Sequence, residues 1–158
     1  MKRIALIFLC CLSACLVRAQ MKPNFIDYLL AEDKYEQAVR IASRELERHP
    51  KDGRLYSQRA TAYLQLNELN RSVEDLTKAI RYYKTADKSL YDLYHMRGVI
   101  YEYLENPKAA LRDYNRMIRL YPDSAGGYML RADLYDELGD SKRANHDYQK
   151  YKLITGTP

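Results

Sequence analysis

The sequence lacks tryptophan and has only three cysteines and six glycines among 158 residues. All three cysteines lie within the first 15 residues, so the rest of the chain has no thiol for a disulfide, a metal site or a nucleophile. No glycine-rich phosphate loop follows a strand pattern, and the three histidines are scattered without metal-ligand spacing. We therefore expect a chain that is not an enzyme and has no catalytic site, no metal and no cofactor.

Long apolar runs are also absent, apart from residues 4–17, which are interrupted only by Ser13 and preceded by Lys2 and Arg3. A membrane-spanning helix needs about 20 apolar residues. The shorter run after a basic start is typical of a secretory signal. We expect the mature chain to be exported.

Two processing sites compete at the end of this run. Cleavage after Ala19 would remove a signal peptide of residues 1–19. The order Leu12-Ser13-Ala14-Cys15 resembles the lipobox of bacterial lipoproteins, in which residues 1–14 would be removed and Cys15 would be lipidated. Both alternatives stay open, so the product is expected in the periplasm or as a membrane-anchored lipoprotein of a bacterial cell envelope. Membrane attachment is expected only through a lipidated Cys15.

The net charge of +5 belongs mostly to this leader. Removing residues 1–19 leaves 23 basic and 21 acidic side chains, a net charge of +2. Because the two signs are interspersed along the sequence and make no evident basic stripe, we expect no nucleic-acid partner.

The remaining sequence repeats itself. Five residues recur 34 positions later, from Tyr94, Gly98, Tyr101, Asp113 and Tyr114 to Tyr128, Ala132, Tyr135, Asp147 and Tyr148. A shift of 38 in the other direction reaches Tyr56, Ala60, Tyr63, Asp75 and Leu76. The predicted units are 53–86, 91–124 and 125–158, with an insertion at 87–90 and a degenerate first unit at 20–52.

Each unit has the apolar spacing of two helices joined by a turn. Asn106 and Pro107 predict a helix start, and Gly139-Asp140 predicts a helix end followed by the next start. Gly126-Gly127 begins a helix and is interpreted as a flexible turn between helices. The first helix of the degenerate unit is expected at about 24–31. Such hairpins must stack on one another to bury a continuous core.

This pattern resembles the tetratricopeptide repeat (TPR). The resemblance implies an all-α, right-handed α-solenoid of about three full TPR hairpins after a degenerate one, with a concave groove lined by the first helices. Small residues where helices approach closely, and tyrosines around them, form the predicted structural set: Tyr56, Ala60, Tyr63, Tyr94, Gly98, Tyr101, Ala110, Tyr114, Tyr128, Ala132, Tyr135, Ala144 and Tyr148.

Oppositely charged residues also recur with the repeat. Arginines at 59, 97 and 131 each precede an aspartate by 16 residues, at 75, 113 and 147. We interpret each pair as an ion pair that locks the two helices of one hairpin. The alternative is an arginine ladder for phosphates.

By the family geometry, the predicted partner groove consists of Ser57, Gln58, Thr61, Gln65, His95, Met96, Val99, Glu102, Tyr103, Met129, Asp133 and Asp136. The groove becomes acidic toward its end, which favours a neutral or basic extended segment. Chaperone-binding members of the family grip a carboxylate with Lys, Arg and Asn on these faces, and this sequence offers no such set.

These features predict a non-catalytic protein-protein interaction scaffold of a bacterial cell envelope. The alternatives are a small lipoprotein assembly factor for an outer-membrane or secretion complex and a regulatory subunit of an enzyme. Asn145 and Lys152 are polar where the earlier units have apolar residues, so the last helix is expected to end the solenoid as a monomer or weak homo-oligomer.

Overall fold

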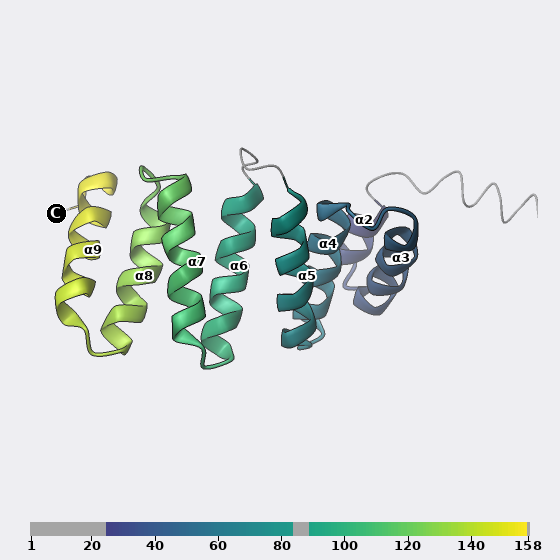
Figure 1. Ribbon diagram of the computed structural model, residues 1–158, viewed down its shortest axis with the longest axis horizontal. Helices are drawn as coiled ribbons and strands as arrows, with labels where there is room; N and C mark the ends of the chain where they lie inside the picture. Colours follow the sequence, from purple (N-terminus) through teal and green to yellow (C-terminus); the bar gives the residue numbers. More distant parts are fainter. Residues whose placement is uncertain (1–24, 84–88, 158) are drawn as a thin grey trace, which may run out of the picture.

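The computed structural model describes residues 25–83 and 89–157, which form a single row of helices (Figure 1). The elements are α2 (Phe25–Ala31), α3 (Tyr35–Arg48), α4 (Gly53–Gln65), α5 (Leu69–Tyr82), α6 (Ser89–Tyr103), α7 (Pro107–Leu120), α8 (Ala125–Glu137) and α9 (Ser141–Thr155). They pair as four successive hairpins, with α2 and α3 at one end of the row and α9 at the other. The all-α, right-handed solenoid is confirmed, with a shortened first helix in its first unit.

Some sequence predictions fall outside the described residues. The signal segment 1–19 and Cys15 lie there, as do the first two residues of the insertion predicted at 87–90. The other two, Ser89 and Leu90, begin α6, and Leu90 is only 5% exposed. This part of the extra sequence therefore lengthens a helix and adds to the core.

The four hairpin turns share one backbone solution. Asp33, Asn67, Glu105 and Gly139 all have positive φ values, between 52° and 76°. In each turn, the N–H of the residue after the positive-φ residue donates a hydrogen bond to the carbonyl five positions earlier, as from Asn106 to Tyr101 at 2.8 Å. This left-handed helix ending also occurs in the degenerate unit. The repeat therefore extends over all four hairpins.

Side-chain caps start two of the helices that follow these turns, α7 and α9. Asn106 accepts a hydrogen bond from the N–H of Ala109 before Pro107 begins α7, and Asp140 accepts one from Arg143 before α9. Both predicted starts are confirmed. Each cap satisfies a backbone donor that has no partner within its own helix.

The interpretation of Gly126-Gly127 as a flexible turn is wrong. Both glycines lie in the first turn of α8, where they allow close packing. A Cβ on Gly126 would stand 2.6 Å from Tyr91 Oη, and one on Gly127 would stand 3.0 Å from Ile118 Cγ1. The missing side chains let α8 approach α6 and α7.

The core runs through the row as a series of small residues and the larger ones that cover them. Ala60, Ala110 and Ala132 are fully buried, and Ala144 is 1% exposed. A Cβ on Gly98 would stand 2.6 Å from the ring of Tyr114, which is itself fully buried. In the hairpin of α6 and α7, the large ring therefore fits against the residue without a side chain.

The second unit fills the same positions differently. Leu76 replaces the tyrosine and is fully buried, and Ser72 replaces the small apolar residue. The Ser72 hydroxyl donates to the carbonyl of Ala60 at 2.8 Å, so its burial leaves no unpaired group.

Candidate functional site

Three arginines of the first helices tie the hairpins together. Arg97 donates from Nε and Nη2 to the two carboxylate oxygens of Asp113, at 2.8 and 2.7 Å. Arg59 binds Asp75 and Arg131 binds Asp147 in the same two-pronged way. The three aspartates are nearly inaccessible to water: Asp75 is 2% exposed, Asp113 3% and Asp147 1%. The predicted locks are confirmed, and their carboxylates occupy the guanidinium edge that a phosphate would need.

Each lock also reaches back to the preceding unit. The remaining Nη1 of Arg59 donates to Ser43 at 2.9 Å, and that of Arg97 donates to Thr77 at 2.9 Å. Arg131 makes the corresponding bond to Asn115. One side chain therefore joins three helices, which is more than the predicted pairing within one hairpin.

The recurring tyrosines flank these arginines. The guanidinium carbon of Arg59 lies 5.7 and 5.8 Å from the ring centres of Tyr56 and Tyr63. The same carbon of Arg97 lies 5.7 and 5.9 Å from those of Tyr94 and Tyr101. These rings are half-buried, as are Tyr128, Tyr135 and Tyr148, so Tyr114 alone of the eight is fully buried. The tyrosine columns shield the ion pairs as well as filling space.

A cleft of about 570 Å³ opens between α4, α5 and α6. Its lining is mainly apolar, with Leu64, Met96, Val99 and Ile100 surrounded by polar side chains. Tyr103 stands at the cleft with 75% of its surface exposed. An exposed aromatic beside an apolar hollow is a common anchor for a partner side chain.

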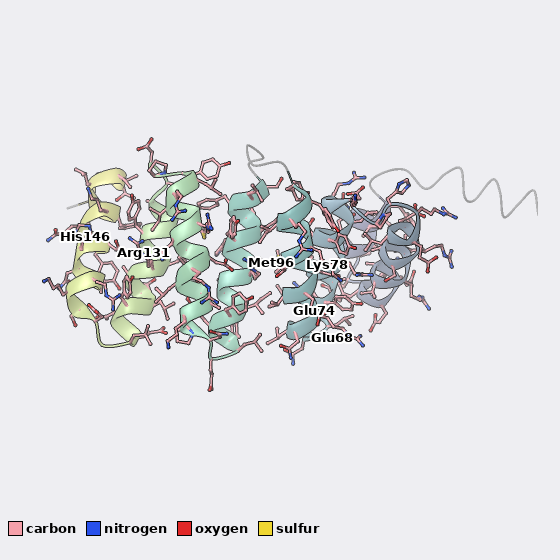
Figure 2. The ribbon with its side chains drawn as sticks, in the orientation of Figure 1. Glu68, Glu74, Lys78, Met96, Arg131 and His146 are labelled. Carbon is pink, nitrogen blue, oxygen red and sulfur yellow. The ribbon has the colours of Figure 1, made fainter. Side chains whose placement is uncertain are left out.

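The cleft unites part of the predicted groove. Five of the predicted residues line it: Gln65, His95, Met96, Val99 and Tyr103. Met129 and Asp136 are exposed on α8, the first helix of the next hairpin. The hydroxyls of Ser57 and Thr61 donate to carbonyls of their own helix. Figure 2 shows Met96 on α6 and Arg131 on α8.

The structure corrects the prediction for Gln58. It was expected to line the groove, but it is 6% exposed and its amide donates to Asp27 of α2 at 2.5 Å. The short first helix packs beside α4 at this point and covers the side chain. Gln58 is therefore a contact between units and cannot meet a partner.

Two predicted acids are held by tyrosines. Tyr114 donates to Glu102 at 2.6 Å, and Tyr148 donates to Asp133 at 2.7 Å. Burial raises the pKa of Glu102, against the hydrogen bond from Tyr114, which lowers it. The bond to Asp133 raises the pKa of Tyr148 to about 12. Both acids stabilise their hairpins in addition to contributing negative charge.

Sequence reasoning missed several groove residues. Leu64, Asn67, Leu69, Asp92 and Ile100 also line the cleft. Asn67 comes from the turn and Leu69 from the second helix of the preceding hairpin. The expectation that only first helices line the groove excludes both positions. No local signal in the sequence marks Asn67 and Leu69 as groove residues, because their place at the cleft depends on how α5 meets α6.

The described residues include no group of three or more His, Cys, Asp or Glu side chains placed to hold a metal ion. Nor does any helix of 25–83 or 89–157 have the length and apolar character to cross a membrane.

Comparison with known proteins agrees with this geometry. Models of the tetratricopeptide repeat match residues 53–85 and 91–124. Serine/threonine-protein phosphatase 5 of Rattus norvegicus is 30% identical over 110 residues, covering 70% of this chain and 21% of that protein. Hsp70-Hsp90 organizing protein of Triticum aestivum is 25% identical over 96 residues, covering 61% of this chain and 16% of that protein. The chain thus spans about a fifth of these relatives.

Solved structures show the same fold. A crystal structure of MamA superposes with a TM-score of 0.72 at 17% identity, covering 90% of this chain and 84% of that one. A MamA double mutant gives a TM-score of 0.71 at 18% identity, covering 83% of this chain and 71% of that one. With its repeated hairpins, arginine locks and matching repeat models, the chain is a member of the tetratricopeptide-repeat family, whose repeats build protein-protein interaction scaffolds.

Proposed function

We propose that this scaffold binds an extended segment of a partner protein along its first helices, in a bacterial cell envelope. The observation that carries the proposal is the apolar cleft between α4, α5 and α6, which gathers five predicted groove residues beside an exposed Tyr103. The partner segment would place an apolar side chain in the cleft.

The surrounding charge favours a segment with basic residues. Asp92 lines the cleft, and Asp136 and Glu137 are exposed on the next first helix. Among the described first helices, Arg54 is the one exposed base outside the locks. The described first helices therefore have no cluster of cations that could bind an acidic tail. For this reason we propose no Hsp70 or Hsp90 partner of the kind named for the Triticum aestivum relative.

The test is capture of partners from the native envelope by three variants and the wild type. Met96→Ala/Tyr103→Ala removes apolar contact at the cleft, and Asp92→Lys/Asp136→Lys reverses charge without touching the acids that hold tyrosines. Leu138→Ala/Leu153→Ala is the matched control, because both leucines are exposed, at 51% and 76%, away from the cleft.

We expect capture of the main partner to fall about tenfold in the cleft and charge variants, as for loss of a central interface contact. The control should capture as the wild type does. Equal capture by all four proteins would overturn the groove assignment.

The sequence around Cys15 supports a second candidate, a lipoprotein assembly factor of an outer-membrane or secretion complex. Mass spectrometry of the exported protein distinguishes the two. An acylated N-terminal Cys15 supports the lipoprotein, and a chain that begins at Gln20 excludes it. A capture dominated by one enzyme, with changed activity of that enzyme, would instead indicate a regulatory subunit.

A further inference from the structure

Charge is sorted by helix in this molecule. The second helices of the hairpins, α3, α5, α7 and α9, expose fourteen basic and three acidic side chains. The bases are Arg40, Arg44, Arg48, Arg71, Lys78, Arg81, Lys108, Arg112, Arg116, Arg119, Lys142, Arg143, Lys150 and Lys152. The first helices expose four acids against the single Arg54. The interspersed signs of the sequence therefore separate by helix, with bases on the second helices and acids on the first. We call the exposed surface of the second helices the basic face.

The cations of the second helices are ordered. Arg44, Lys78, Arg116 and Lys150 occupy the same position of the four units, and we call them the basic column. Within the described residues, none of the four belongs to an ion pair, whereas Arg48, Arg71 and Arg143 pair with neighbouring acids. Figure 2 shows Lys78 on α5 and the column's neighbour His146 on α9.

The locks increase this imbalance. Asp113 and Asp147 are the acids of α7 and α9, and both are buried against arginines of the first helices. Neither helix exposes an acid. Arg116 has Arg112 and Arg119 one turn away on each side, so no acid of α7 offsets the positive charge of these three side chains. Such a face attracts anions over an extended area.

We propose that this basic face binds the phosphate headgroups of an anionic membrane surface, while the acidic first helices stay open to a protein partner. One column cation per unit gives contacts along the whole row, which fits an extended charged surface better than a small anion. No aromatic side chain is exposed on the described second helices, so the stacking platform of single-stranded nucleic-acid binding is missing there. The apolar segment 4–17 with its basic start also predicts delivery of the chain to a membrane.

The experiment measures partition of the full chain onto vesicles in 150 mM NaCl. One set of vesicles is pure phosphatidylcholine, and the other contains about one third phosphatidylglycerol. Binding to the neutral vesicles reports the leader, which all variants share. The difference between the two sets reports the bases of the leader and of the basic face together. Because the leader is the same in all variants, a change of this difference between variants reports the face.

Two variants with the same change of net charge separate position from total charge. Arg44→Gln/Lys78→Gln/Arg116→Gln/Lys150→Gln removes the basic column. Gln65→Glu/His95→Glu/Tyr103→Glu/Met129→Glu adds the same negative charge at exposed positions of the first helices. Helical content and melting temperature confirm that both are folded.

We expect the column variant to lose about tenfold or more of its preference for anionic vesicles, since each cation near such a surface contributes substantially. The control should change less than about threefold, and wild-type binding should weaken as salt rises. Equal losses in both variants, or loss in neither, would overturn the proposal. Transfer RNA is the competing probe: if the column variant loses RNA binding but keeps its vesicle binding, the face belongs to nucleic acid and the proposal is wrong.

Discussion

At the residue scale, the arginine of each lock uses its geometry and its charge together. A guanidinium can direct parallel N–H groups to a carboxylate while another N–H reaches a third group, which a lysine ammonium cannot reproduce in the same arrangement. The hydrogen bond to Asp75 raises the pKa of Arg59, and the bond to Asp147 raises that of Arg131. The side chains of Arg59, Arg97 and Arg131 are 16%, 14% and 18% exposed, so water screens these pairs weakly.

Removing one member of a lock should therefore be costly. We expect Asp113→Ala to lower the free energy of unfolding by about 3 kcal/mol, because it leaves Arg97 charged and partly buried without its carboxylate. Arg71→Ala breaks an exposed pair with Glu68 and should cost less than about 1 kcal/mol. Urea denaturation measures both, and equal costs would contradict the assigned role of the locks.

The positive-φ turn residue makes a second prediction. Glu105 has a φ of 52°, which is unfavourable for a side chain with a Cβ. Glu105→Gly should raise the free energy of unfolding by about 1 kcal/mol. Gly139→Ala should lower the free energy of unfolding by a similar amount. The new Cβ would have no atom within 4 Å, so no packing contact would offset the backbone strain. A stabilised Gly139→Ala protein would show that these turns do not carry the expected strain.

Tyr148 should make stability depend on alkaline pH. Its pKa is raised to about 12 by the bond to Asp133, above an unfolded value of about 10. The folded state therefore favours the neutral phenol, and this contribution is complete below pH 10 and is lost as pH rises toward 12. Urea midpoints at several pH values should fall more steeply for the wild type than for Tyr148→Phe. Parallel curves would contradict the assigned hydrogen bond.

At the element scale, the hairpins were the most predictable feature. Asn106, Pro107 and Gly139 act through local backbone chemistry, so a single sequence reveals them. Gly126 and Gly127 misled the prediction because their purpose is tertiary: local chemistry indicates a turn, but Tyr91 and Ile118 require the missing side chains. Gln58 failed for a similar reason, because the degenerate α2 still packs against α4.

The pairing of small and large residues across a hairpin gives a further prediction. Gly98→Ala should destabilise the protein by about 1 to 3 kcal/mol, because its Cβ would collide with the Tyr114 ring. Adding Tyr114→Leu reproduces the Ala60 and Leu76 combination of the second unit and should recover part of the loss. Denaturation of the single and double variants measures the coupling, and strictly additive losses would contradict the paired fit.

At the scale of the whole molecule, charge is divided between the two helices of each hairpin, and α9 is polar at two positions that are apolar in earlier units. Asn145 and Lys152 are exposed on α9, at positions where earlier units have Leu111 and Ile118. The repeat period predicted these positions. The charge division was equally present in the sequence, in four basic residues at the period of the repeat. Net charge hides it because the sum combines the basic second helices with the acidic first helices.

The cleft was the least predictable part of the site. Its lining depends on how α5 and α6 meet, and the insertion predicted at 87–90 interrupts the regular period between them. Groove residues such as Met96 and Val99 follow from helix faces alone. The neighbouring turn residue Asn67 does not, since its contribution depends on the spacing of successive units.

The central claim is that a protein partner lies along the first helices. Site-specific photo-crosslinking in the native envelope tests it most directly, with the probe placed singly at Gln65, Tyr103 and Met129 of the first helices and at Lys78 and Arg116 of the second helices. All five positions are exposed, so each probe can be accommodated. We predict that one protein crosslinks from Gln65, Tyr103 and Met129 and is absent from Lys78 and Arg116. A protein that crosslinks from the second-helix positions and from none of the first would contradict the account.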